Sequence, residues 1–100
     1  MDLELESGIV IRQVAEKDLA EHIEREDFAI LLEGPLTYMQ CAKQAPDSGY
    51  VLEYQDGSVK EHYGAIGGPI ALDRVVSAFI KYLRRDPSWR GDFEWERVPV

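Results

Sequence analysis

The segment around Asp56-Gly57 constrains the fold most, because it predicts a β-hairpin. Two alternating runs, 50–55 and 58–63, flank this dipeptide. Asp-Gly between such runs is typical of a two-residue type I′ turn, in which both residues take positive φ. The turn would pair Gln55 with Ser58. Its predicted apolar face contains Tyr50, Leu52, Tyr54, Val59 and Tyr63, with Glu61 as an exception to explain. The predicted polar face contains Glu53, Gln55, Ser58, Lys60 and His62, with Val51 as its exception.

Two further segments have the period of amphipathic helices. Apolar residues recur three and four positions apart at Leu72, Val75, Val76, Phe79, Ile80 and Leu83. Cations follow at 84–85, where the negative end of a helix dipole favours them, and Asp86-Pro87 ends the pattern. A shorter pattern over 15–25, with Leu19 and Ile23 four apart, predicts a short N-terminal helix.

The remaining segments indicate strands. The ranges 3–5, 9–14, 36–43 and 93–98 alternate or are β-branched, and 28–32 is a continuous apolar run that ends at a Gly34-Pro35 turn. We therefore predict an α+β fold for a single domain over 1–100. It would contain a mostly antiparallel sheet of about five to six strands, one long C-terminal amphipathic helix and one short N-terminal helix.

Length and composition agree with one folded domain. The chain has 100 residues, of which 45% are hydrophobic and 30% are charged. A chain of this length buries roughly two thirds of its unfolded surface and leaves no room for a second core. No apolar stretch approaches the roughly 20 residues that cross a bilayer. The single cysteine, Cys41, and an N-terminus unlike a secretory signal indicate a cytoplasmic protein.

The charge of the chain restricts its partners. The formal net charge is -8, and most of it lies in residues 1–33, which carry ten acidic and three basic side chains. Such a charge repels phosphate backbones and anionic membranes, so we expect binding to neither nucleic acid nor membrane.

Two groups of residues could carry chemistry. Asp18, His22 and Glu26 are spaced by four on the first helix, as metal ligands or an acid-base pair would be. A solvated charged face explains this spacing better, because metal sites need more converging ligands.

Cys41 and His62 could form a nucleophile and a base, but a buried structural cysteine is commoner. The sequence matches no catalytic, zinc or phosphate-binding template. We expect no enzyme activity, no metal and no cofactor.

Exposed aromatic and charged residues suggest a protein interface. The loop after the long helix carries Trp89 and Arg90, and such residue types dominate interface hot spots. Glu21, Glu24 and Glu26 on the first helix offer acidic contacts to a basic partner.

The segments 49–58, 62–63, 76–83 and 89–95 resemble small, uncharacterised bacterial proteins. In their amino-acid sequence they also look like some immunity proteins of polymorphic toxin systems. Such immunity proteins are small, single-domain, often acidic inhibitors of a cognate toxin. The likeness covers about the last half of the chain, and it assigns no functional residue.

Three hypotheses follow from the sequence. The first is a non-catalytic acidic module, of immunity or inhibitor type, that binds a basic protein. The second is a self-associating module, such as a homodimer that meets through edge strands or the 89–95 region. The third is a small hydrolase or metal-dependent enzyme that uses His22 or His62.

Overall fold

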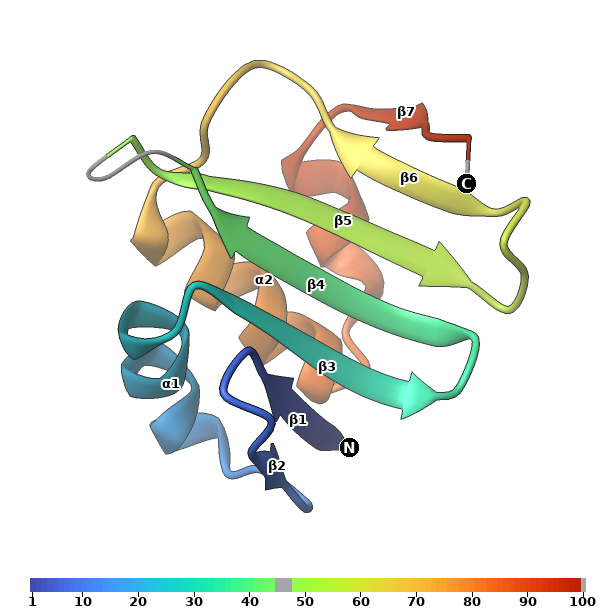
Figure 1. Ribbon diagram of the computed structural model, residues 1–100. Coiled ribbons are helices and arrows are strands. Elements are labelled where there is room, and N and C mark those ends of the chain that lie inside the picture. Colours follow the sequence, from blue (N-terminus) through green and yellow to red (C-terminus); the bar gives the residue numbers. More distant parts are fainter. Residues whose placement is uncertain (45–47, 100) are drawn as a thin grey trace.

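The computed structural model describes residues 1–44 and 48–99 and confirms the α+β architecture (Figure 1). All neighbouring strands are antiparallel, in the order β2-β1-β3-β4-β5-β6-β7, so the sheet has seven strands and exceeds the expected five to six. The elements are β1 (Asp2–Leu5), β2 (Val10–Ile11), the 3₁₀ helix η1 (Glu16–Asp18), α1 (Leu19–Arg25), β3 (Phe28–Gly34), β4 (Thr37–Lys43), β5 (Tyr50–Asp56), β6 (His62–Ala65), α2 (Leu72–Leu83), the 3₁₀ helix η2 (Pro87–Asp92) and β7 (Trp95–Arg97).

Both helices lie on one face of the sheet and cover the core (Figure 1). The apolar stripe of α2 buries Phe79 completely, and α1 buries Leu19 and Ile23, as the helical periods predict. They pack against alternate residues of the strands. The fully buried strand residues are Leu3, Ala29, Leu31, Met39 and Leu52. None of the helices in the described ranges is long and apolar enough to span a membrane.

The predicted two-residue hairpin turn is wrong. Gln55 pairs with His62 rather than Ser58, and residues 57–61 form the connection. Gly57 takes a positive φ of 79°, but the backbone N–H of Asp56 donates to the carbonyl of Glu61 at 3.0 Å. This register stacks Tyr54 on Tyr63 with ring centroids 5.1 Å apart, a contact that the short turn would forfeit.

The predicted faces of the hairpin are correct although its predicted pairing is wrong. The partner of Gln55 moves by four residues, and an even shift keeps each side chain on its original side of the sheet. Val59 and Glu61 both lie in the exposed connection rather than on a strand. Val59 is 54% exposed and is not part of the apolar face, and the predicted exception at Glu61 does not arise.

The N-terminal segment also differs from the expectation. The predicted strand over 9–14 shrinks to the two residues of β2, and β1 is the longer strand beside β3. Leu3 is fully buried, because the alternation of 3–5 directs it under the helices.

Candidate functional site

No helix of the described residues lies on the face of the sheet turned away from α1 and α2 (Figure 1), and we call this side the open face. Strand alternation and the pairing register place fifteen residues on it. They are Asp2, Glu4, Val10, Phe28, Ile30, Leu32, Tyr38, Gln40, Ala42, Val51, Glu53, Gln55, His62, Gly64 and Glu96.

The β3 part of the open face is apolar. Phe28, Ile30 and Leu32 lie there half-buried, although an uncovered side of an antiparallel sheet usually alternates to polar residues. The continuous apolar run over 28–32 thus supplies apolar side chains to both sides of β3. Such a run is typical of a strand that is covered on both faces.

All charged strand residues of the open face are acidic, apart from His62. They are Asp2, Glu4, Glu53 and Glu96, and no lysine or arginine of the fifteen balances them. Elsewhere in the described structure, several carboxylates pair with arginine or lysine, as in Glu33 with Arg85 and Asp92 with Lys81. The open face is therefore the side of the sheet with an uncompensated negative charge.

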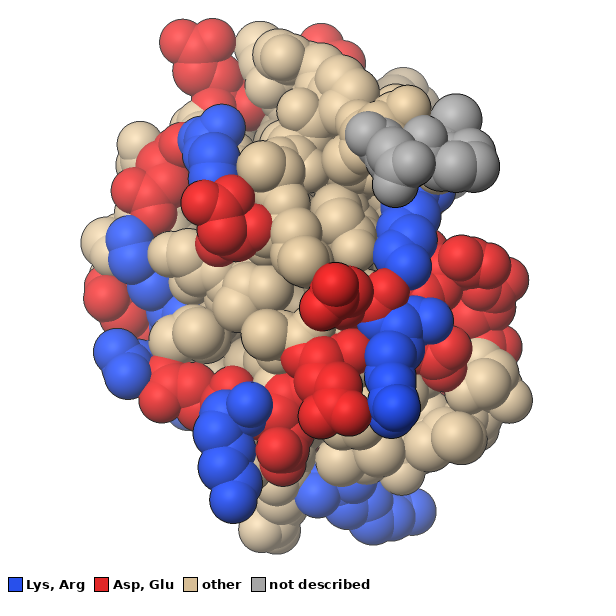
Figure 2. All heavy atoms as spheres, turned by 90° about the vertical axis from the view of Figure 1, so that its left-hand side faces the viewer, with Lys and Arg blue, Asp and Glu red and all other residues tan. Residues whose placement is uncertain are grey.

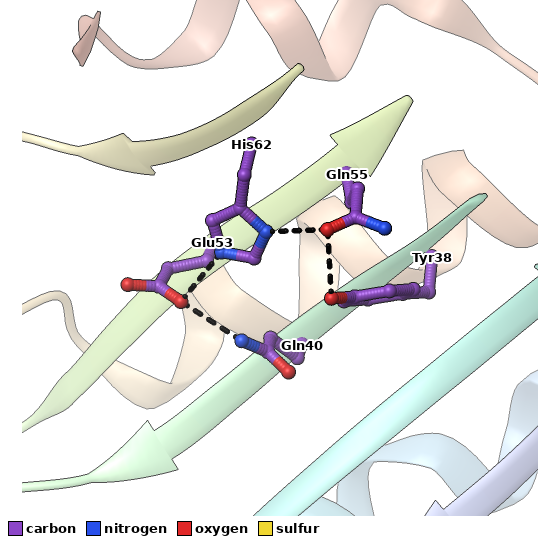
Figure 3. A network of polar contacts seen from close by, with 5 residues as sticks. All are labelled: Tyr38, Gln40, Glu53, Gln55 and His62. Carbon is purple, nitrogen blue, oxygen red and sulfur yellow. Dashed lines mark hydrogen bonds and ion pairs between the residues drawn. The ribbon is translucent and has the colours of Figure 1, made fainter. Parts of the chain in front are cut away.

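A chain of hydrogen bonds crosses the centre of the open face (Figure 3). The hydroxyl of Tyr38 donates to Gln55 Oε1 at 3.2 Å, and His62 Nδ1 lies 3.0 Å from the same oxygen. On its other side, His62 Nε2 lies 3.0 Å from Glu53 Oε1, to which Gln40 Nε2 donates at 2.8 Å. Three adjacent strands, β4, β5 and β6, supply these five side chains.

Both ring nitrogens of His62 face acceptors. Gln55 Nε2 donates to the carbonyl of Leu36 at 3.2 Å, so Gln55 Oε1 is the atom that faces His62 Nδ1. Glu53 Oε1, which faces His62 Nε2, is also an acceptor. The network therefore holds the imidazole ring from both sides.

The side chain of His62 is buried. It is only 3% exposed, and both of its ring nitrogens lie 3.0 Å from an acceptor. The hairpin alternation places His62 on the polar face, but it did not predict that the side chain would be buried there opposite Gln55.

Cys41 lies on the other side of the sheet from His62. Its cross-strand neighbours are the buried Ala29 and Leu52, whereas His62 lies opposite Gln55 on the open face. Burial raises the pKa of the Cys41 thiol to about 12. The sheet separates the two side chains, and the protonated thiol is a poor nucleophile, so a Cys41–His62 pair does not form.

The predicted residues Trp89 and Arg90 flank a hollow beyond the end of β5. Trp89 is only 5% exposed and packs edge-to-face on Tyr54, so the expected exposure of its indole is wrong. The side chain of Arg90 is about half exposed, lies over the Tyr54 and Trp89 rings, and bonds Asp56 at 3.2 Å. The hollow has a volume of about 250 Å³. Arg85 and Glu33, which form an ion pair with each other, also line it.

The predicted acidic residues of α1 lie at the opposite end of the sheet. Glu21 and Glu24 are exposed there, and Glu26 accepts a hydrogen bond from the Ser7 hydroxyl. Lys43, whose partner is the first residue of β5, donates to the Glu24 carbonyl. Figure 2 shows the side of the molecule that carries α1, where Asp and Glu side chains crowd among a few Lys and Arg. The structure thus separates these residues from Arg90 and from the open face.

The spacing of Asp18, His22 and Glu26 does not produce a metal site. Within 1–44 and 48–99, no group of three or more His, Cys, Asp or Glu side chains could hold a metal ion. Asp18 belongs to η1 rather than α1, so the three residues do not share one regular helix.

The comparisons with known proteins give no further guidance. No protein-family model, no curated protein and no solved structure matches this chain.

Sequence reasoning found part of this site. The hairpin alternation placed Glu53, Gln55 and His62 on one polar face, but it gave no sign that Tyr38 and Gln40 complete their hydrogen bonds. The apolar part of the open face was also not predicted. The signal for it was the continuous apolar run over 28–32, which indicates a strand with apolar side chains on both sides.

Proposed function

We propose that this chain is a non-catalytic protein-binding module whose open face binds a basic partner. The single observation that carries the proposal is the composition of that face. It combines half-buried apolar side chains on β3 with carboxylates on β1, β5 and β7 and with no lysine or arginine among its strand residues.

The layout of the open face matches the usual anatomy of an interface. Protein interfaces place an apolar and aromatic centre inside a polar rim. Here Ile30 and Tyr38 lie in the interior of the sheet, while Glu4 and Glu96 lie near its two edges in the same cross-strand row. A partner with an apolar patch and basic rim would therefore complement both the shape and the charge.

An immunity-type or inhibitor-type role is the specific form of this proposal. The acidic composition suits an inhibitor that covers a basic toxin. The resemblance in 49–58, 62–63, 76–83 and 89–95 leads to the same class, and the network on the open face provides prearranged polar contacts.

Self-association is the weaker alternative. Two copies that met through their open faces would bring together acidic rims of the same sign, which costs free energy. The edge strands β2 and β7 have two and three residues, and very short edges offer little for edge-to-edge pairing.

Site-specific photo-crosslinking in cells of the source organism tests the proposal. A photoreactive amino acid at Ile30 probes the open face, and one at Glu24 probes α1 as the matched acidic control. We expect Ile30 to crosslink one basic protein and Glu24 to crosslink none. A crosslink from Glu24 alone would move the interface to α1, a crosslink to a second copy would indicate a homodimer, and no crosslink at either site would contradict the proposal.

Charge reversal sharpens the same test. Glu4→Lys with Glu96→Lys should slow association with the crosslinked partner, because rim charges act mainly on the association rate. Glu21→Lys with Glu24→Lys adds the same charge on α1 and should leave that rate almost unchanged. Association with the wild-type chain should also slow as the ionic strength rises.

A further inference from the structure

The side chain of Glu53 occupies the middle of the open face. It lies halfway along β5, the fifth of seven strands, and 25% of the side chain is exposed. Interface residues with large energetic effects are concentrated at such central, partly desolvated positions. Glu53 is therefore the acidic residue of this face that a bound partner would shield most completely from water.

The two carboxylate oxygens of Glu53 have different surroundings. Oε1 accepts from Gln40 Nε2 at 2.8 Å and lies 3.0 Å from His62 Nε2. No hydrogen bond among the described residues uses Oε2. The close-up in Figure 3 shows Oε2 directed away from both Gln40 and His62. One oxygen thus anchors the side chain, and the other remains available to an external donor.

The neighbouring strand leaves room for this orientation. Gly64 lies directly across from Glu53, and a Cβ built at Gly64 would lie 3.7 Å from Glu53 Oε2 and 3.2 Å from Val98 Cγ2. A Cβ at position 64 would therefore crowd Val98 and lie in ordinary contact with Glu53, and a larger side chain would limit the space beside the carboxylate. With Gln40 and His62 on one side and Gly64 beneath, the carboxylate is held before a partner arrives, which lowers the entropic cost of binding.

We propose that Glu53 is the anchor of the interface and that its Oε2 accepts hydrogen bonds from an arginine of the partner. This proposal rests on the proposed function. Arginine is the expected donor, because its weakly hydrated guanidinium is favoured over a lysine ammonium in buried and interface ion pairs.

The first test needs no partner. Nα-acetyl-arginine amide is titrated into the isotope-labelled full chain, and the Glu53 carboxylate carbon and the His62 ring are followed by NMR. The citrulline analogue, which has the same shape without the charge, is the control ligand. We expect arginine to cause saturable chemical-shift changes at both residues and citrulline to cause none. In Glu53→Gln, arginine should no longer shift the His62 ring signals. In Glu24→Gln, the shifts at both residues should persist. Equal shifts with citrulline, or unchanged shifts in Glu53→Gln, would overturn the anchor.

The second test uses the partner that Ile30 crosslinks. Glu53→Gln should weaken its binding by about tenfold or more, as expected for a central hot spot. Glu24→Gln should change it by less than about twofold, since a surface charge outside the interface contributes little. Thermal unfolding of each variant shows that it is folded.

The outcomes separate the two proposals. If Ile30 crosslinks a partner and Glu53→Gln binds it as tightly as the wild type, the anchor is wrong and the protein-binding function stands. If arginine binds at Glu53 while Ile30 crosslinks nothing, the arginine site stands and the protein-binding function is wrong.

Discussion

The two faces of the sheet consist of the same strands but differ in burial and polarity. On the covered face, Leu3, Leu31 and Leu52 are completely buried beneath α1 and α2. One position along each strand, the open face carries Glu4, Ile30 and Glu53, which remain half-buried. Since no helix covers this side, its polar groups bond to one another across β4, β5 and β6.

This difference gives the two faces unequal shares in stability. The covered face contributes the burial that holds the domain together, because hydrophobic stabilisation scales with the apolar area removed from water. The open face contributes less burial, and its polar side chains hold one another in position through hydrogen bonds. Substitutions on the two faces should therefore have different consequences.

The largest effect is expected beneath the covered face. Phe79→Ala removes a fully buried ring from the middle of α2 and should lower the free energy of unfolding by about 3 to 5 kcal/mol. Ser77→Ala, on the exposed side of the same helix, should change it by less than about 0.5 kcal/mol. Urea titration measures both, and a loss below about 1 kcal/mol for Phe79→Ala would mean that α2 does not pack as described.

Adjacent residues of β3 offer the most direct comparison of the faces. Leu31 is fully buried and Ile30 is half-buried on the other side. Leu31→Ala should cost about 2 to 5 kcal/mol, whereas Ile30→Ala should cost about 1 kcal/mol and weaken partner binding instead. Equal losses in urea titration would show that Ile30 serves the fold of the isolated chain as much as Leu31.

A smaller effect is expected from the buried histidine of the open face. His62→Ala removes the ring that contacts both Gln55 Oε1 and Glu53 Oε1, which should cost about 1 to 3 kcal/mol. His22→Ala, at the only other histidine, should cost less than about 1 kcal/mol, because that side chain is only half-buried on α1.

Per pH unit, the smallest expected effect is alkaline and belongs to Cys41 on the covered face. Its thiol ionises near its ordinary pKa of 9.0 in the unfolded chain, while burial raises the pKa to about 12 in the folded chain. Between these values the unfolded chain holds fewer protons, so the free energy of unfolding falls as pH rises, by up to about 1.4 kcal/mol per pH unit. Below pH 9.0 the thiol is protonated in both states and adds no pH dependence.

Cys41→Ala isolates this contribution. The variant lacks the thiol, so the stability gap between it and the wild type should narrow above pH 9.0. A gap that stays constant up to the alkaline limit would show that the thiol is accessible in the folded chain.

The sequence by itself determined the α+β class, both helices and the inward side of most strands. These features depend on local spacing, and a period of 3.6 or 2 persists whatever the rest of the chain does. It also placed Glu53, Gln55 and His62 on one side of the hairpin, because alternation decides the side independently of the exact turn.

Only the tertiary structure decided the pairing of β5 with β6 and the surroundings of the polar residues. The Tyr54–Tyr63 stack and the burial of His62 outweighed the local preference of Asp56-Gly57 for a two-residue turn. Burial of Trp89 and the separation of Cys41 from His62 likewise follow from which residues the helices cover. Contacts between distant segments depend on the packing of the whole chain, which no local pattern encodes.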